Sequence, residues 1–452
     1  MVNLNKSYDT IVIGAGNAGQ GAAGELKKAG KSVAIIESHD VGGTCPNHGC
    51  VPKKILVAAS ETLDSIRRAA GHHITAATPS LDWSKLIERK RGLIGSMPDA
   101  MAKSLEDRGI DLYRGSAQFT GKNTVSVDGK NLTAESVVVA TGSRPRPLSF
   151  PGAELITSSS GFLDMNKLPA SAIFVGGGVI ALEFAHVLAR LGTTVTILEI
   201  APTILGRFDQ GAVTALTDFS TNILHIQLHT GVGIDSVERA PKSCLKVSFS
   251  KDGKNQTVTA EQVFHGAGRV PNFEGLHLAK AGITEEGGRV ALDGLRSQEN
   301  QKIWFAGDLL RTPQLSPVAS AEGRTVGRLI AGQAVALPDY SFVPSAVYTT
   351  PVLARVGLTE EEAAAKGVEV DVKKTDMSGW LGAKTYLEDV AYAKVLVNKK
   401  NGTIAGAHLV GHGASETINF LSLAMEHAVP AESLRSRIYA YPTFTNDLRF
   451  VI

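Results

Sequence analysis

The sequence contains very little cysteine and no strong excess of charge. Only three cysteines, Cys45, Cys50 and Cys244, occur in 452 residues, and an oxidised structural framework in a chain of this length would need more. The formal net charge is +2, which gives no reason to expect nucleic acid or an anionic membrane as a partner. Disulfide-stapled scaffolds and strongly basic nucleic-acid binders are therefore disfavoured.

Long apolar runs are also missing. No segment is long enough to span a bilayer, and the N-terminal residues MVNLNKSYDT lack the apolar core of a signal peptide. With 43% hydrophobic and 20% charged residues, the composition is that of a soluble globular protein. We expect a cytoplasmic protein of about two to four domains, in which a close cysteine pair is catalytic or metal-binding.

Glycine is abundant, with 47 residues. Residues 8–13 (YDTIVI) predict a buried strand, a glycine-rich turn and a helical pattern follow, and KSVAIIE at 31–37 predicts a second strand that ends in an acid. This order is the dinucleotide-binding βαβ pattern. In it, Gly14 permits the tight turn, Gly16 lets the backbone approach a pyrophosphate and Gly19 lets the helix pack closely. Glu37 can accept hydrogen bonds from ribose hydroxyls.

A second copy of the pattern occupies residues 172–199. Its turn contains Gly176, Gly178 and Ile180, and its second strand ends at Glu199. One such glycine motif is weak evidence, but two copies in full strand–turn–helix–strand context indicate two dinucleotide sites.

Four further stretches of the chain have patterns of their own. Residues 60–110 are helical in pattern, 116–142 read as short strands, and Pro-rich 143–151 is a candidate domain boundary. From about residue 341 the chain loses its glycine motifs, and NKKNGT predicts a hairpin turn. We expect an α/β fold with two Rossmann-like domains and a C-terminal α+β domain. The predicted segments are 1–150 and 272–340 for the first dinucleotide domain, 151–271 for the second and 341–452 for the third.

The cysteine pair lies in GGTCPNHGCVPKK at 42–54. Zinc would need further ligands, and His48 is the only obvious candidate, so a metal site is disfavoured. If the segment is helical, the two cysteines could face each other across a turn and form a disulfide. A thiolate beside a positive charge or a helix N-terminus attacks disulfides readily. Cys244, in a strand-like stretch, is interpreted as an ordinary buried or half-buried thiol.

This cysteine segment resembles the active site of the flavoprotein disulfide reductases, the family of glutathione reductase, dihydrolipoamide dehydrogenase and mercuric reductase. The resemblance covers essentially the whole chain, including ATG at 140–142, GAGRVPN at 266–272 and AGD at 306–308. It implies FAD at the first glycine pattern, NAD(P)H at the second, and a homodimer formed through the third domain.

The resemblance also implies residue roles. Cys45 and Cys50 would form a redox-active disulfide, with Cys50 next to the flavin and Cys45 attacking the substrate. Lys53 would lie near the flavin and pair with Glu183, and Asp308 would bind the FAD ribitol. The other implied cofactor contacts are Gly43, Thr44, Thr141, Gly142, Gly268 and Ala319. Electrons would pass from nicotinamide through flavin and the disulfide to an oxidised substrate.

Glu199 bears on the choice of nicotinamide. A carboxylate there accepts the adenosine 2′-OH and repels a 2′-phosphate. NADPH-specific relatives place arginines just after this strand, whereas this chain has Ile200, Ala201 and Pro202. Arg207 lies further along and could reach back, so NADPH use stays open. We expect a preference for NADH.

The C-terminal segment departs from the family pattern. Relatives carry a His-Pro-Thr segment with a glutamate five positions after the histidine, and that histidine protonates the leaving thiol across the dimer. Here Tyr441 replaces the histidine and Asn446 the glutamate. A phenol is a poor base at neutral pH but can donate a proton. Tyr441 is therefore a candidate catalytic residue, and the alternative is that Tyr439 and Tyr441 only pack at the interface.

The substrate stays open between several classes. Gly24 stands where glutathione reductases hold a substrate carboxylate with an arginine, and lipoamide enzymes rely on the His–Glu pair. The leading hypothesis is reduction of a small disulfide or related electrophilic sulfur compound. The alternatives are a metal-ion or quinone reductase of mercuric-reductase type and a flavin redox sensor or electron-donor subunit.

Overall fold

The structure is a computed structural model that describes residues 6–77 and 79–452. The described chain forms two compact units, each assembled from three stretches of sequence. The first unit contains the chain up to Lys53 with Glu88–Arg146 and Arg269–Tyr340, and the second contains Lys54–Ile87, Pro147–Gly268 and Ser341–Ile452. The four-segment domain division expected from the sequence stays a prediction.

The N-terminal stretch in which no signal peptide is expected begins with residues 1–5, which lie outside the described part of the chain. Within residues 6–77 and 79–452, no helix combines the length and the apolar character needed to cross a membrane.

The first unit is organised around a nine-stranded sheet. Its strands are β1 Lys6–Ile13, β2 Val33–Glu37, β3 Asp111–Arg114, β4 Gln118–Gly121, β5 Thr124–Val127, β6 Lys130–Val139, β16 Leu292–Asp293, β17 Arg296–Ser297 and β18 Ile303–Phe305. β18, β6, β1, β2 and β3 lie side by side in that order and are parallel. Central strands of such sheets are covered on both faces and are apolar throughout. Ile11 of β1 and its partner Val137 of β6 are accordingly fully buried.

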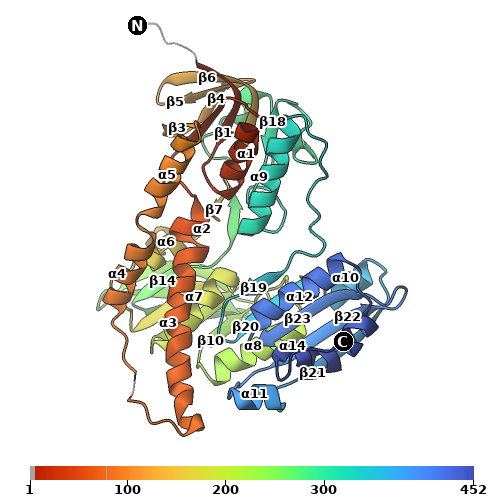
Figure 1. Cartoon of the computed structure of the whole chain (residues 1–452). Helices are drawn as coiled ribbons and strands as arrows, with labels where there is room; N and C mark the ends of the chain where they lie inside the picture. Colours follow the sequence, from red (N-terminus) through yellow and green to blue (C-terminus); the bar gives the residue numbers. More distant parts are fainter. Residues whose placement is uncertain (1–5, 78) are drawn as a thin grey trace. The chain divides into compact units, whose positions relative to one another are not determined.

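Helices pack against this sheet and carry the cysteine segment. The helices are α1 Asn17–Lys28, α2 Thr44–His48, α3 Cys50–Arg68, α4 Trp83–Ile94, α5 Met97–Asp107 and α9 Ser316–Ile330. Part of α3 and part of α4 belong to the second unit. α1 and α9 lie side by side (Figure 1). A short antiparallel pair, β7 (Ser143–Pro145) and β15 (Arg269–Pro271), completes the unit.

The second unit contains the second βαβ pattern as a four-stranded parallel sheet in the order β10-β9-β8-β14. The bounds are β8 Ser171–Val175, β9 Thr194–Glu199, β10 Gln227–Thr230, β14 Gln262–His265, α6 Ser159–Asp164, α7 Val179–Arg190 and α8 Gln210–Asn222. An antiparallel sheet of β11 (Gly233–Ala240), β12 (Cys244–Lys251) and β13 (Lys254–Ala260) follows. Cys244 is half-buried at the start of β12, as expected.

The C-terminal part of this unit is an antiparallel sheet in the order β19-β20-β23-β22-β21 with helices against it. The bounds are β19 Ser345–Val347, β20 Val352–Gly357, β21 Val370–Asp376, β22 Tyr392–Asn398, β23 Ile404–Gly411, α10 Glu360–Ala365, α11 Leu381–Thr385, α12 Ala414–Glu426, α13 Ala431–Ser436 and α14 Phe444–Asp447. The predicted hairpin joins β22 and β23. The expected fold class, with two Rossmann-like parts and a C-terminal α+β part, is confirmed.

Candidate functional site

The first glycine turn is fixed by a close approach of two backbones. Gly14 has φ of 104°, a conformation that favours glycine. A Cβ at this position would lie 2.4 Å from the carbonyl oxygen of Ala140. Gly19, on the first helical turn of α1, is packed just as closely, because its Cβ would lie 1.9 Å from the Gly14 oxygen. The expected tight turn and close helix packing are both present.

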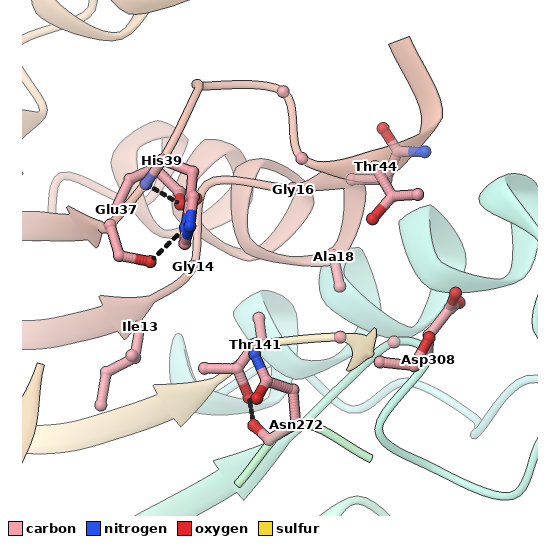
Figure 2. Close-up of a pocket in the computed structure, with 18 of the residues that line it drawn as sticks. Ile13, Gly14, Gly16, Ala18, Glu37, His39, Thr44, Thr141, Asn272 and Asp308 are labelled. Carbon is pink, nitrogen blue, oxygen red and sulfur yellow. Dashed lines mark hydrogen bonds between the residues drawn. The ribbon is translucent and has the colours of Figure 1, made fainter. Parts of the chain in front are cut away.

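Glu37 ends β2 and faces this turn (Figure 2). Its two carboxylate oxygens accept hydrogen bonds from the backbone N–H of Ala15, at 2.7 Å, and of His39, at 2.9 Å. These two bonds hold the acid at the position where a ribose would meet the turn.

The turn opens into a cavity of about 360 Å³ that lies wholly within the first unit. That volume falls within the usual range for ligand pockets, roughly 300–1,000 Å³. Nine of the residues expected at the first cofactor line it: Gly14, Gly16, Glu37, Gly43, Thr44, Thr141, Gly142, Asp308 and Ala319. Gly16 and Gly43 approach so closely that a Cβ on Gly43 would lie 2.8 Å from the Gly16 Cα. Because both residues are glycines, no side chain keeps a pyrophosphate away from the backbone here, which fits a dinucleotide.

Asp308 lies on the turn between β18 and α9, and burial raises the pKa of its carboxyl while the nearby Arg269 opposes that rise. The turn is held by Glu322, a fully buried residue of α9. Glu322 accepts hydrogen bonds from the Gly307 N–H, at 2.6 Å, and from the Tyr340 hydroxyl, at 2.9 Å. The sequence analysis did not identify Glu322, because its hydrogen-bond partner Gly307 lies on the loop that precedes α9.

The cysteine pair lies on two consecutive helices. α2 carries Cys45 and α3 begins at Cys50, with Gly49 between the two helices. Cys45 is a half-buried thiol and Cys50 an exposed one. A hydrogen bond with Cys50, followed by burial, raises the pKa of the Cys45 thiol. The Cys50 thiol therefore lies close enough to Cys45 to affect its protonation.

Cys45 also lines the cavity of the first glycine turn. Two residues that the sequence analysis did not single out, Asn17 and Ser316, line it too. The Ser316 hydroxyl lies 3.6 Å from the Cys50 sulfur. Lys53 follows Cys50 by one turn of α3. The pairing of Lys53 with Glu183 stays a prediction.

The second glycine turn repeats the geometry of the first. Gly176 also has φ of 104°, and its Cβ would lie 2.4 Å from the carbonyl group of Gly266. Glu199 accepts hydrogen bonds from the N–H of Gly177, at 2.5 Å, and of Ala201, at 2.7 Å.

The other residues expected at the second site are less constrained. Gly178 precedes the first residue of α7, and Ile180 is a half-buried second residue of that helix. Gly268 has φ of 90° and is exposed, with open space around it. Their cofactor contacts stay a prediction.

One face of α7 is charged and buried. Glu183 accepts a hydrogen bond from the Tyr348 N–H at 2.8 Å. Arg190 donates to the Thr350 carbonyl oxygen and pairs with Asp64 at 3.2 Å. His186 contacts the Thr350 carbonyl oxygen at 3.3 Å, and burial lowers the pKa of its imidazole to about 3.

The C-terminal segment separates the two candidate tyrosines. The Tyr439 hydroxyl donates to the Leu434 carbonyl oxygen at 2.8 Å, and its ring packs edge-on against Phe420. Tyr441 is 72% exposed. Asn446 is buried in α14, and its amide donates to Asp447 at 3.5 Å. Packing therefore accounts for Tyr439, while the role of Tyr441 stays a prediction.

Comparison with known proteins agrees with this arrangement. Residues 8–323 match the family model described as pyridine nucleotide-disulphide oxidoreductase, and residues 343–450 match the dimerisation domain of that family. The chain is 32% identical over 452 residues to a mercuric reductase of Staphylococcus aureus, covering 99% of this chain and 82% of the relative.

Two further relatives are named for other activities. A dihydrolipoyl dehydrogenase of Bacillus subtilis (strain 168) is 32% identical over 441 residues, covering 96% of this chain and 93% of the relative. A glutathione reductase of Burkholderia cepacia is 30% identical over 441 residues, covering 97% of each chain. The chain therefore belongs to the pyridine nucleotide-disulphide oxidoreductase family, NAD(P)H-dependent flavoproteins that use FAD and act on sulfur groups.

Proposed function

We propose that this chain is an NADH-dependent reductase of a small disulfide or related electrophilic sulfur compound, and that it acts as a homodimer. The observation that supports the reaction best is the position of the Cys45 thiol in the cavity of the first glycine turn. A dithiol that opens into a dinucleotide cavity can exchange electrons with a cofactor bound there.

The residues around that cavity would hold FAD. The Gly14–Gly16 turn would face its pyrophosphate, Glu37 its ribose and Asp308 its ribitol chain. When bound, FAD supplies electron transfer between a nicotinamide and the cysteine pair. The second glycine turn, with Glu199, would hold the nicotinamide dinucleotide.

The cysteine pair would carry out the substrate half of the reaction. The Cys45 thiolate attacks one sulfur of the substrate disulfide, so that a Cys45–substrate bond forms and the first thiolate leaves. Cys50 then attacks the Cys45 sulfur, forming the protein disulfide and releasing the second thiolate. The two thiol protons end on the two products, and the two electrons of the dithiol reduce the substrate. Tyr441 is the proposed proton donor to a leaving thiolate.

The cysteine role is tested by anaerobic reduction with NADH followed by a panel of disulfides, metal ions and quinones. Reduction should produce a long-wavelength charge-transfer band, and a substrate should abolish it. We expect C45S to lower disulfide turnover about a thousandfold and to leave reduction by NADH intact. C244S, which changes the remaining cysteine, is the matched control. Disulfide turnover that survives in C45S would contradict the proposal.

The NADH preference rests on Glu199. Because both its oxygens accept backbone N–H groups, the carboxylate is fixed at the strand end, where it would repel a 2′-phosphate. We expect kcat/KM for NADH to exceed that for NADPH. E199Q keeps a hydrogen-bond acceptor and removes the negative charge. The ratio of kcat/KM for NADH to kcat/KM for NADPH should therefore fall about tenfold. E37Q, the same change at the first glycine turn, is the control. A higher kcat/KM for NADPH in the unaltered protein would refute the preference.

Glutathione is disfavoured as the substrate because Gly24 has no side chain that could hold a substrate carboxylate. The guanidinium of Arg108 lies beside this position, since a Cβ on Gly24 would be 2.6 Å from it. Loss of any glutathione turnover in R108A would show that Arg108 takes over that role.

Metal-ion reduction is the second candidate, because the mercuric reductase of Staphylococcus aureus aligns with 99% of the chain. In the part of the chain that the structure describes, no three His, Cys, Asp or Glu side chains gather as a metal site. A soft metal substrate would therefore depend on Cys45 and Cys50. Reoxidation of the reduced protein by Hg²⁺ and not by any disulfide would favour this alternative.

A further inference from the structure

Two helices of the first unit begin at the cavity that the cysteine pair lines. α1 begins at Asn17, directly after β1, and α9 begins at Ser316, after β18. β1 and β18 lie on either side of β6 in the same parallel sheet. The carboxyl ends of parallel strands share one edge of a sheet, so both helices start from the same edge.

Close packing fixes the two helices against each other. A Cβ on Gly323 of α9 would lie 2.0 Å from the Ala18 carbonyl oxygen of α1. One turn later, a Cβ on Gly327 would lie 2.6 Å from the Ala22 oxygen. Backbones in such contact leave little freedom to slide. The side chains at the two helix starts are therefore held at a set distance from each other.

Asn17 and Ser316 line the same cavity as Cys45. The Ser316 hydroxyl lies 3.6 Å from the Cys50 sulfur. Cys50 and burial raise the pKa of the Cys45 thiol, and the nearby Ser316 and Asn17 side chains oppose that rise as hydrogen-bond partners. A hydroxyl and an amide N–H are donors, and donors favour the anionic form of a thiol.

We infer that Asn17 and Ser316 are positioning residues that hold the sulfur anion of the reduced cysteine pair. Ser316 acts on both sulfurs, and Asn17 acts on Cys45. The inference rests on the proposed function for the chemistry of the pair. Asn17 belongs to the first glycine motif, and the inference gives it a role beyond cofactor binding. The aligned residue of the second motif, Val179, has an apolar side chain that cannot donate a hydrogen bond.

The test uses the FAD-loaded protein, reduced anaerobically with dithionite so that it does not depend on NADH. Two midpoints are measured against pH: that of the charge-transfer band, which reports Cys50, and that of Cys45 alkylation by iodoacetamide, followed by mass spectrometry. S316A removes the hydroxyl, and S316T keeps it. N17V copies the second motif. S320A, one turn further along α9, is the matched control.

We expect S316A to raise both midpoints by about one pH unit, roughly the effect of one hydrogen bond to a charged group. S316T should restore both. N17V should raise only the Cys45 midpoint. The other titratable neighbours, His48 with its partner Asp40 and Lys53 in α3, stay in place in every variant.

Midpoints in S316A and N17V that equal those of S320A would overturn the inference. If the unaltered protein consumes no disulfide while the midpoints shift as expected, the proposed function fails and the positioning role stands. If the unaltered protein reduces disulfides and no midpoint moves, the positioning role fails alone.

Discussion

The two glycine turns of this chain can be compared residue by residue, because their spacing is the same. Gly14 and Gly176 share a φ of 104°, and a Cβ on either would meet a carbonyl group at 2.4 Å. Glu37 and Glu199 each accept two backbone hydrogen bonds. Up to the start of the helix, the two sites are built alike.

The helices that follow differ on their packed faces. In α1 the positions aligned with Glu183, His186 and Arg190 of α7 are occupied by Gly21, Gly24 and Lys28. α1 packs through its small residues against α9, whereas the charged face of α7 binds the segment at 348–350. The glycine turn therefore indicates a dinucleotide site. The residues on the packed face of the following helix determine which segment of the chain that helix contacts.

The largest expected effect comes from breaking either turn. G14A and G176A each force alanine into a left-handed conformation and against a carbonyl group, which costs more than the ~1–2 kcal/mol of backbone strain alone. We expect G14A to be recovered without FAD. G176A should keep FAD, with its KM for NADH raised at least about tenfold. Absorbance spectra and steady-state kinetics measure both. Equal loss of FAD in the two variants would mean that the sites are not independent.

A smaller effect should separate the two helix faces. Arg190 is 1% exposed, so R190A leaves the Thr350 oxygen without this donor and Asp64 without this cation. We expect the free energy of unfolding to fall by about 3 kcal/mol. K28A at the aligned position should cost less than about 0.5 kcal/mol, because the Lys28 side chain is 74% exposed. Urea unfolding of both proteins checks the contrast, and similar losses would refute it.

A change of one pH unit should have a smaller effect than R190A. Folding lowers the pKa of His186 from 6.5 to about 3, so the unfolded chain binds a proton more readily between these values. Stability due to neutral His186 is present above pH 6.5 and is lost as the pH falls, by about 1.4 kcal/mol per pH unit. H186Q should lack this slope. H427Q, at an exposed histidine, should keep it. If the free energy of unfolding depends on pH in the same way in the unaltered protein and in H186Q, His186 is not held neutral in the folded state.

Much of this architecture is predictable because its determinants are local. Each βαβ pattern is a continuous stretch in which glycine, apolar residues and a terminal acid follow one another, and the structure contains both. The hairpin between β22 and β23 is predicted from its turn residues for the same reason. The nine expected residues that line the first cavity also belong to short local motifs.

The parts that the sequence did not reveal depend on contacts between distant segments. Ser316 meets the cysteine pair only because β18 is inserted beside β6 and because α9 packs on α1. The spacing of Gly323 and Gly327 on one face of α9 is the available signal, since small residues four apart permit close helix packing. The hydrogen bond of Tyr439 to Leu434 could not be foreseen, because a hydroxyl finds its acceptor only once the local backbone is folded.

The interrupted course of the first unit has a consequence for synthesis on the ribosome. Its cavity needs Gly14 from the beginning of the chain, but also Asp308 and Ser316, which are made much later. Chains emerge from the N-terminus and domains generally fold as units. The strands of the second glycine turn, which end at β14, are complete before β18 is made. The second unit, however, also includes Ser341–Ile452, which are made after β18. Each dinucleotide site therefore depends on a segment made long after its own glycine turn. The first site receives its last strand before the second receives the segment at 348–350 that α7 binds.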